Sequence, residues 1–85
     1  MTYEYVLKKV QVIVSDQFGC DTAQCGPDID LGRDLGGDSL DLVSIVLDVE
    51  TELAIKISED DTDAVHTVGD LAAAAARALD VEVPA

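Results

Sequence analysis

The most informative segment of the sequence is Asp34-Leu35-Gly36-Gly37-Asp38-Ser39-Leu40-Asp41, which leads without a break into an apolar run ending at Leu53. Asp38 is expected to cap a helix here, because its carboxylate can accept a hydrogen bond from the backbone amide of Asp41 or of a neighbouring residue. Asp41 then lies in the first turn, where the exposed amides favour negative charge. A helix is therefore predicted over residues 39–53.

Ser39 occupies the first position of this predicted helix, with its hydroxyl directed outward. Gly36 and Gly37 precede it and carry no side chains, so a second protein can approach the hydroxyl closely. This arrangement favours an attachment point over an active site.

The predicted helix carries two apolar bands when its residues are projected at about 100° per residue. One band suits a core and comprises Leu42, Ile45, Val46, Val49 and Leu53. The second lies on the side of Ser39 and comprises Leu40, Val43 and Leu47, edged by Asp41, Ser44, Glu50 and Thr51. A small protein can bury one band against its own helices, so we expect the second band to meet cargo or a partner protein.

The octapeptide at residues 34–41 is close to the D-L-G-x-D-S-L-D motif of acyl carrier proteins. Apolar residues follow the spacing of that family from about Tyr3 to Leu79, and the chain length and acidity also agree. The chain thus resembles an acyl carrier protein over most of its length. The resemblance agrees with the helical patterns in predicting an all-α fold, a small four-helix bundle of three main helices and one short helix.

In the resembled family, the serine matching Ser39 is esterified by phosphopantetheine, which a phosphopantetheinyl transferase delivers from coenzyme A with magnesium. The thiol of this arm holds acyl intermediates as thioesters, so the resemblance implies a non-catalytic carrier. A helix N-terminus suits the phosphodiester, because the free amides and the helix dipole favour an anion there. The resemblance also implies that Asp38 helps to hold the magnesium ion during transfer.

The implied partners are the transferase and acyl-processing enzymes with basic docking patches, such as an acyltransferase or acyl ligase and a ketosynthase. These enzymes belong to fatty-acid, polyketide or related biosynthesis. The resemblance implies a docking surface that comprises Leu40, Asp41, Val43, Ser44, Leu47 and Glu50. Within that surface, Asp41 and Glu50 are expected to pair with basic residues of the partners.

Two positions depart from the pattern of fatty-acid carriers. Ser44 stands where glutamate is common, and Leu47 stands where methionine is common. Together with Cys20, Cys25 and the alanine-rich last helix, these departures favour a specialised carrier for polyketide or other secondary pathways. Aminoacyl and peptidyl carriers share the serine and the bundle, but the acidity and the D-S-L-D ending favour acyl cargo.

The 85 residues carry a formal net charge of −13, and 48% of them are hydrophobic. A chain of this size is expected to form one domain over residues 1–85, as a monomer of modest stability. Residues 28–63 contain twelve acidic and two basic residues, a net charge of −10. This charge argues against nucleic acid as a partner and favours basic protein surfaces. The chain shows neither an apolar run long enough to span a membrane nor a secretory signal, so a cytoplasmic location is expected.

Cys20 and Cys25 are separated by four residues, without a second Cys or His pair that could complete a zinc site. Both fall where the resembled family tends to place small apolar residues, so the resemblance implies buried thiols that act as small hydrophobes. A disulfide between them stays open as an alternative for an oxidising environment.

Three further helices are predicted. The first spans residues 3–17, with Thr2 as its cap and Gly19 as its stop, and the second is a short helix over residues 59–64 capped by Ser58. The last spans residues 68–79, where Thr67 and Asp70 resemble a capping box.

The connecting segments are less regular. Residues 20–37 form a long loop anchored by Ile29, Leu31 and Leu35, and its length suggests either a functional loop or a short hidden turn of helix. Residues 54–57 alternate in polarity but are too short and isolated for a sheet. Residues 80–85 are predicted to form a loose tail.

Parts of the same sequence also resemble the signatures of three other functions. Gly37-Asp38-Ser39-Leu40 matches the opening signature of the GDSL hydrolases, and Asp63-Ala64-Val65-His66 supplies their D-x-x-H, but no set of strands is predicted to hold a serine triad. Calcium binding is suggested by Asp28, Asp30 and Asp34, but an EF-hand loop starting at Asp28 fails at Gly32, Arg33 and Ser39. The third is an acidic inhibitor or assembly protein without a cofactor.

Overall fold

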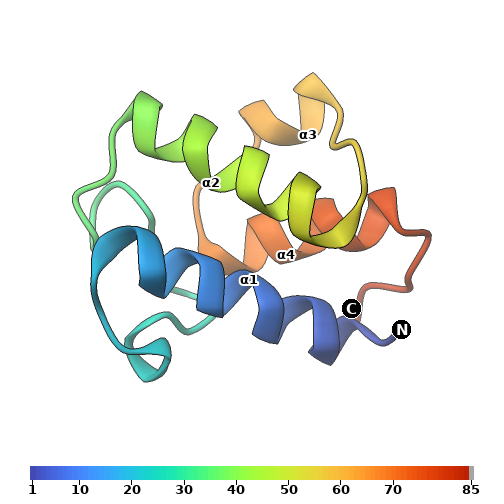
Figure 1. The fold of residues 1–85 in the computed structure, drawn as a ribbon, viewed down its shortest axis with the longest axis horizontal. Coiled ribbons are helices and arrows are strands. Elements are labelled where there is room, and N and C mark those ends of the chain that lie inside the picture. The colour runs from blue at the N-terminus through green and yellow to red at the C-terminus, as the bar shows by residue number, and fades with distance from the viewer. Residues whose placement is uncertain (85) are drawn as a thin grey trace.

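The computed structural model describes residues 1–84, which form four α-helices and one short 3₁₀ helix. The long helices are α1 (Tyr3–Phe18), α2 (Ser39–Leu53) and α4 (Val68–Ala78), and α3 (Glu59–Asp63) is short (Figure 1). The predicted all-α architecture of three main helices and one short helix is confirmed. None of these helices has the length and apolar character needed to cross a membrane.

Local capping explains where α1 begins and ends. The Thr2 hydroxyl accepts a hydrogen bond from the backbone N–H of Tyr5 at 3.3 Å, and Gly19 follows the last residue of the helix. Every fourth residue along one face is apolar, and Val6, Val10 and Val14 are fully buried. The spacing of the apolar side chains thus determines which face of α1 turns inward.

The core lies where α1 packs against α2 and α4. Helix α4 can approach α1 closely because much of its inward face is alanine, which adds little bulk, with Ala72, Ala74, Ala75 and Ala76 all fully buried. Larger side chains fill the remaining space, and they include Ile45 and Val49 from α2 and Val68 and Leu71 from α4. In Figure 1 the two helices α1 and α2 run across the molecule with α4 between and behind them.

The long loop between α1 and α2 is ordered by contacts with the core and with the start of α4. Leu31 is fully buried, and Ile29 and Leu35 pack against the core as predicted. The hidden helical turn exists and is the 3₁₀ helix η1 (Thr22–Gln24). An isolated antiparallel bridge joins Asp30 to Thr67, and within residues 1–84 it is the sole β-type pairing. Residues 54–57 accordingly form no strand.

The segment after α4 differs from the predicted loose tail. Asp80 adopts a positive φ of 58°, and the backbone N–H of Val81 donates to the carbonyl of Ala76 at 2.8 Å. The chain therefore turns back, and Val81 and Val83 pack against the core. Apolar side chains at alternate positions make this packing favourable. Residue 85, the end of the predicted tail, lies outside the described residues.

Candidate attachment site and docking surface

The start of α2 is fixed by a reciprocal pair of hydrogen bonds. The backbone N–H of Asp41 donates to Oδ1 of Asp38 at 3.0 Å, and the backbone N–H of Asp38 donates to Oδ2 of Asp41 at 3.1 Å. This capping box satisfies one free amide of the first turn and stops the helix from extending backwards. Ser39 is held as the first residue of the helix, with its side chain exposed.

Glycine is needed at the two positions before Asp38 for different structural reasons. Gly36 has a φ of +72°, a conformation that residues with a Cβ rarely adopt. At Gly37, an added Cβ would lie 2.8 Å from the carbonyl oxygen of Leu31 and 2.8 Å from Cζ of Phe18. Gly37 is therefore required by packing within the chain. This reason differs from the one predicted from the sequence, which was the close approach of a second protein.

A hollow of about 290 Å³ opens beside Ser39 between α2 and α3. Its lining is partly apolar, with Leu42 and Val43 on α2 and Val65 after α3. Thr62, Asp63 and His66 complete it on the other side. The tertiary structure thus brings the D-x-x-H segment to the same hollow as Ser39, although the two are more than twenty residues apart in the sequence.

These residues are not arranged as a hydrolase triad. Across residues 1–84, no hydrogen bond joins the side chains of Ser39, Asp63 and His66, and no sheet supports them. His66 instead precedes the cap of α4, and its backbone N–H donates to Oδ2 of Asp70 at 3.0 Å. The predicted role of His66 as a polar residue before a helix cap agrees with this contact.

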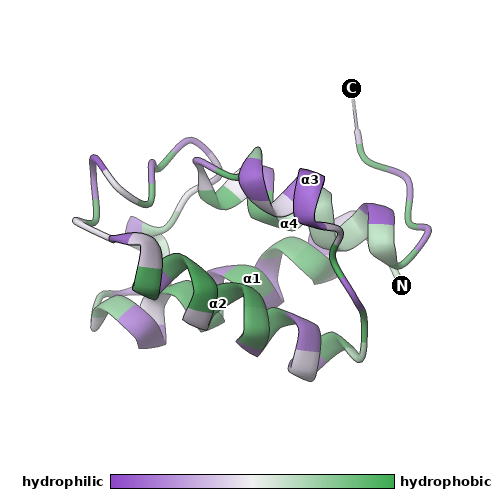
Figure 2. Cartoon of the chain, turned by 90° about the horizontal axis from the view of Figure 1, so that it is seen from above, coloured by the Kyte–Doolittle hydropathy of each residue, from purple (hydrophilic) through white to green (hydrophobic). Residues whose placement is uncertain are grey.

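The second apolar band of α2 faces solvent. Leu40 is 79% exposed, and Val43 and Leu47 are each 54% exposed, whereas Ile45 and Val49 of the other band are fully buried. Figure 2 shows α2 as predominantly hydrophobic and the neighbouring α3 as predominantly hydrophilic. The two bands predicted from the sequence are therefore separated as expected, and all three side chains of the outer band stay at least half exposed among residues 1–84.

The polar edge of this band has internal partners that the sequence did not predict. Gln17, at the end of α1, donates from Nε2 to Oδ1 of Asp41 at 3.2 Å, and its Oε1 accepts from Oγ of Ser44 at 3.3 Å. Oε2 of Glu50 accepts from the backbone N–H of Ile57 at 2.8 Å. Asp41, Ser44 and Glu50 are half-buried, whereas the fourth edge residue, Thr51, is exposed. Gln17 was missed because no short-range pattern relates it to residues 41 and 44.

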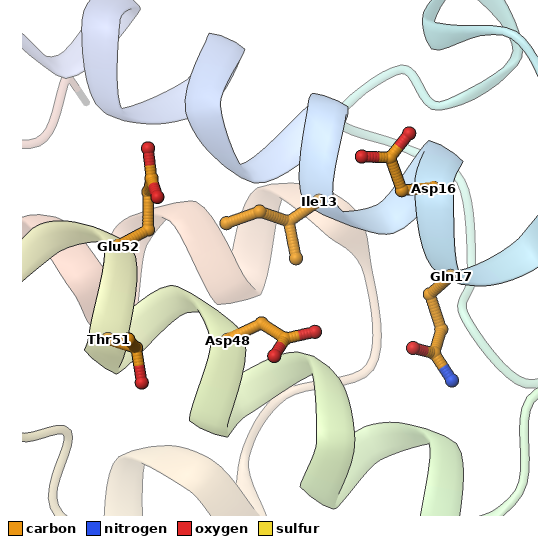
Figure 3. A pocket seen from close by; sticks show the side chains of 6 residues that line it. All are labelled: Ile13, Asp16, Gln17, Asp48, Thr51 and Glu52. Carbon is orange, nitrogen blue, oxygen red and sulfur yellow. The ribbon is translucent and has the colours of Figure 1, made fainter.

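A second hollow, of about 370 Å³, lies between α1 and α2 (Figure 3). Ile13, Asp16 and Gln17 line it from α1, and Asp48, Thr51 and Glu52 line it from α2. At its end, Nζ of Lys9 lies 3.2 Å from Oε1 of Glu52, and this hydrogen bond raises the pKa of Lys9. Three of the six lining residues are acidic, and one of these, Glu52, is paired with Lys9.

The aspartates that suggested calcium hold the loop instead. Oδ1 of Asp30 accepts the backbone N–H groups of Gly32 at 2.9 Å and Arg33 at 2.8 Å, and Oδ2 of Asp34 accepts the backbone N–H of Asp30 at 2.8 Å. The hydrogen bond from the Arg33 amide lowers the pKa of Asp30. Among the described residues no group of three or more His, Cys, Asp or Glu side chains is placed to hold a metal ion.

Comparison with known proteins places this geometry in a family. The family described as "Phosphopantetheine attachment site" matches residues 8–75. An acyl carrier protein of Thermotoga maritima is 41% identical over 68 residues, which cover 80% of this chain and 84% of that protein. The chain belongs to the acyl carrier protein family. It is a non-catalytic carrier with a phosphopantetheine attachment site, as predicted.

Two further carriers extend the comparison. An acyl carrier protein of Solidesulfovibrio magneticus is 40% identical over 65 residues, which cover 76% of this chain and 83% of that protein. The solved structure of an acyl carrier protein from Enterococcus faecalis superposes with a TM-score of 0.76 at 32% identity, covering 92% of this chain and 99% of that one. The family implies a phosphopantetheinyl transferase and acyl-processing enzymes as the partners of this acyl carrier protein.

Proposed function

We propose that Ser39 is the residue that bears the phosphopantetheine arm. The chain contains four serines, all within the described residues. Ser15 is buried and donates to the carbonyl of Val12, Ser44 donates to Gln17, and Ser58 accepts from the amide of Asp61 as the cap of α3. Ser39 alone combines an exposed side chain with a hydroxyl that makes no hydrogen bond to residues 1–84, which is the observation that carries the proposal.

The surroundings of Ser39 suit a phosphodiester. The first amides of a helix have no partner within the helix, and Asp38 satisfies the amide of Asp41 while leaving those of Ser39 and Leu40. These amides and the helix dipole favour an anion next to the hydroxyl. When bound, the arm supplies a thiol on a flexible chain. The apolar side of the adjacent hollow, formed by Leu42, Val43 and Val65, can receive part of it.

Intact mass measurement tests this assignment. The chain is incubated with coenzyme A, magnesium and a competent phosphopantetheinyl transferase, and we expect one phosphopantetheine to be added. Ser39→Ala should abolish the addition. Ser58→Ala is the matched control, because Ser58 is an exposed serine at the start of another helix, and the addition should persist in it. Loss of modification in Ser58→Ala alone, or its persistence in Ser39→Ala, would refute the assignment.

Asp38 is proposed to help hold the magnesium ion during arm transfer. Its exposed carboxylate is adjacent to Ser39 in the chain, and Oδ1 accepts the amide of Asp41. Oδ2 has no protein partner among the described residues and is available to a hard cation, which prefers carboxylate oxygens together with phosphate.

The outer band of α2, which comprises Leu40, Val43 and Leu47, is proposed as the apolar centre of the docking surface. Exposed apolar patches of this kind mark interaction sites. The acidic residues around it, Asp38, Asp48 and Asp63, are exposed and suit basic partner patches. Asp41, Ser44 and Glu50 lie at its edge, where their half-buried groups also hold α2 against the rest of the chain.

The docking proposal is tested with a charge placed on the band. Leu47→Asp should raise the KM of a cognate ketosynthase or acyltransferase for the holo-carrier on the order of tenfold, because a carboxylate would be desolvated in an apolar contact. Val12→Asp is the matched control, since Val12 is a 48% exposed apolar residue on α1, away from this band. Equal effects of both variants would contradict a localised docking surface.

A specialised pathway, polyketide or other secondary metabolism, is proposed on the basis of residue 44. Ser44 adds no charge to the docking edge and is engaged with Gln17. Ser44→Glu should increase the rate of loading by fatty-acid-synthesis enzymes if the missing charge limits recognition. An unchanged rate would count against a docking role for this position.

A further inference from the structure

The two cysteines lie close together in space. Their Sγ atoms are 3.4 Å apart, and neither cysteine forms a disulfide. Cys25 is fully buried, whereas Cys20 is only partly buried. The predicted burial of both thiols is thus correct for Cys25 and only partly correct for Cys20, which keeps access to solvent.

The backbone between the two thiols is already fixed. Cys20 directly follows Gly19 at the end of α1, and Cys25 follows the 3₁₀ helix η1. The amide of Cys25 donates to the carbonyl of Thr22 at 3.0 Å, and its own carbonyl accepts Nε2 of Gln11 at 3.0 Å. A disulfide bond is about 2.05 Å long. The two sulfurs, which are 3.4 Å apart, therefore need to approach by about 1.35 Å to form the bond.

We infer that Cys20 and Cys25 form an oxidisable dithiol, which a low-molecular-weight disulfide of the glutathione class converts into an intramolecular disulfide. The thiolate of Cys20 attacks one sulfur of the small disulfide, which forms a mixed disulfide and releases one small thiol. Cys25 then loses its proton and attacks Sγ of Cys20, which releases the second small thiol. The two electrons and two protons of the dithiol end on the two small thiols.

The two cysteines have different roles in this sequence of steps. Burial, followed by the contact with Cys20, raises the pKa of Cys25 to about 11, so Cys25 is a poor first nucleophile in neutral solution. Cys20 is accessible to an external disulfide. Once the mixed disulfide has formed, Cys25 is the thiol beside it, and its proximity compensates for its high pKa.

The first experiment uses the chain with Ser39→Ala after its intact mass has shown that no arm is attached, so that Cys20 and Cys25 are the only thiols. It therefore gives its answer whether or not the assignment of Ser39 is correct. The protein is equilibrated in graded ratios of reduced to oxidised glutathione, both folded and in concentrated urea. Free thiols are then trapped, and the intact mass reports the loss of two hydrogen atoms.

The folded chain should form the disulfide with an equilibrium constant some tens of times that of the unfolded chain, because closing a short loop constrains the unfolded state. The free energy that favours the disulfide in the folded chain also stabilises the folded state of the oxidised chain. The oxidised form should therefore melt roughly 5–15 °C above the reduced form. The inference would be overturned if the equilibrium constant for disulfide formation were the same in the folded chain and in urea. Accumulation of a stable glutathione adduct without ring closure would also overturn it.

The second experiment assigns the roles. Cys25→Ser should form a glutathione adduct at Cys20 rapidly, and Cys20→Ser should form one at Cys25 at least about tenfold more slowly. Circular dichroism checks that both variants fold. Brief alkylation of the unsubstituted chain, followed by peptide mapping, gives the same ranking if a variant fails to fold. Faster modification of Cys25 would contradict the assigned order.

Discussion

Asp38 has two roles that substitution can separate. It caps α2 through the amide of Asp41, and it is proposed to hold magnesium during arm transfer. Asp38→Ala removes both roles. Asp38→Asn keeps an oxygen that can accept the same amide, but it removes the negative charge.

The magnitudes follow from the contacts. Loss of a cap costs about 1 kcal/mol, and loss of a negative charge beside the helix N-terminus costs about 0.3–1 kcal/mol. Asp38→Ala should therefore lower the melting temperature by roughly 5–15 °C in a domain of this size. Asp38→Asn should lower the melting temperature by only a few degrees, because the cap is retained. Removing one negative charge also reduces the repulsion within a chain of net charge −13, which offsets part of the loss.

Arm transfer should respond differently from stability. Both variants should lose on the order of tenfold in transferase kcat/KM at limiting magnesium, and excess magnesium should recover part of the loss. The assay is the initial rate of phosphopantetheine addition at a temperature where every variant is folded. Thr67→Ala is the matched control, because Thr67 caps α4 by accepting the amide of Asp70 at 3.0 Å. It should lose stability and keep its transfer rate.

Two results would contradict the roles assigned to Asp38. If Asp38→Asn transfers the arm as efficiently as the unsubstituted chain at every magnesium concentration, Asp38 is a cap and holds no metal. If Asp38→Ala melts at the same temperature as the unsubstituted chain, the capping box contributes nothing to stability.

Three further predictions concern stability. Ala54 ends α2 with a positive φ of 54°, so Ala54→Gly should stabilise the chain by about 0.5–1 kcal/mol and raise its melting temperature, and a fall would contradict this. The pKa of Asp30 is lowered from 3.8 on folding, so its contribution to stability is present above that value and is lost as the pH falls through the lower folded pKa. On acidification, the melting temperature of Asp30→Asn should therefore fall by less than that of the unsubstituted chain. Equal falls in the two melting temperatures would count against this role of Asp30. Finally, raising the ionic strength from about 0.01 to 0.15 M shortens the screening length from about 30 to 8 Å. The melting temperature should rise because repulsion within a chain of net charge −13 is reduced, and a decrease would show that attractive pairs dominate.

Features that depend on near neighbours in the chain could be predicted from the amino-acid sequence. Capping at Thr2, Asp38, Ser58 and Thr67 involves residues three positions apart, and apolar periodicity selects the inward face of the three long helices. These interactions form within one or two helical turns and can be derived without a fold. The exposed band on α2 followed from the same periodicity.

Contacts between distant segments could not be predicted and became visible in the folded chain. Gln17 reaches Asp41 and Ser44 from another helix, and Gly37 must be glycine because Phe18 and Leu31 pack against it. The hollow beside Ser39 likewise exists because α3 lies next to the start of α2. Such contacts depend on how helices are placed relative to one another, and that placement minimises the exposed apolar surface of the whole chain at once.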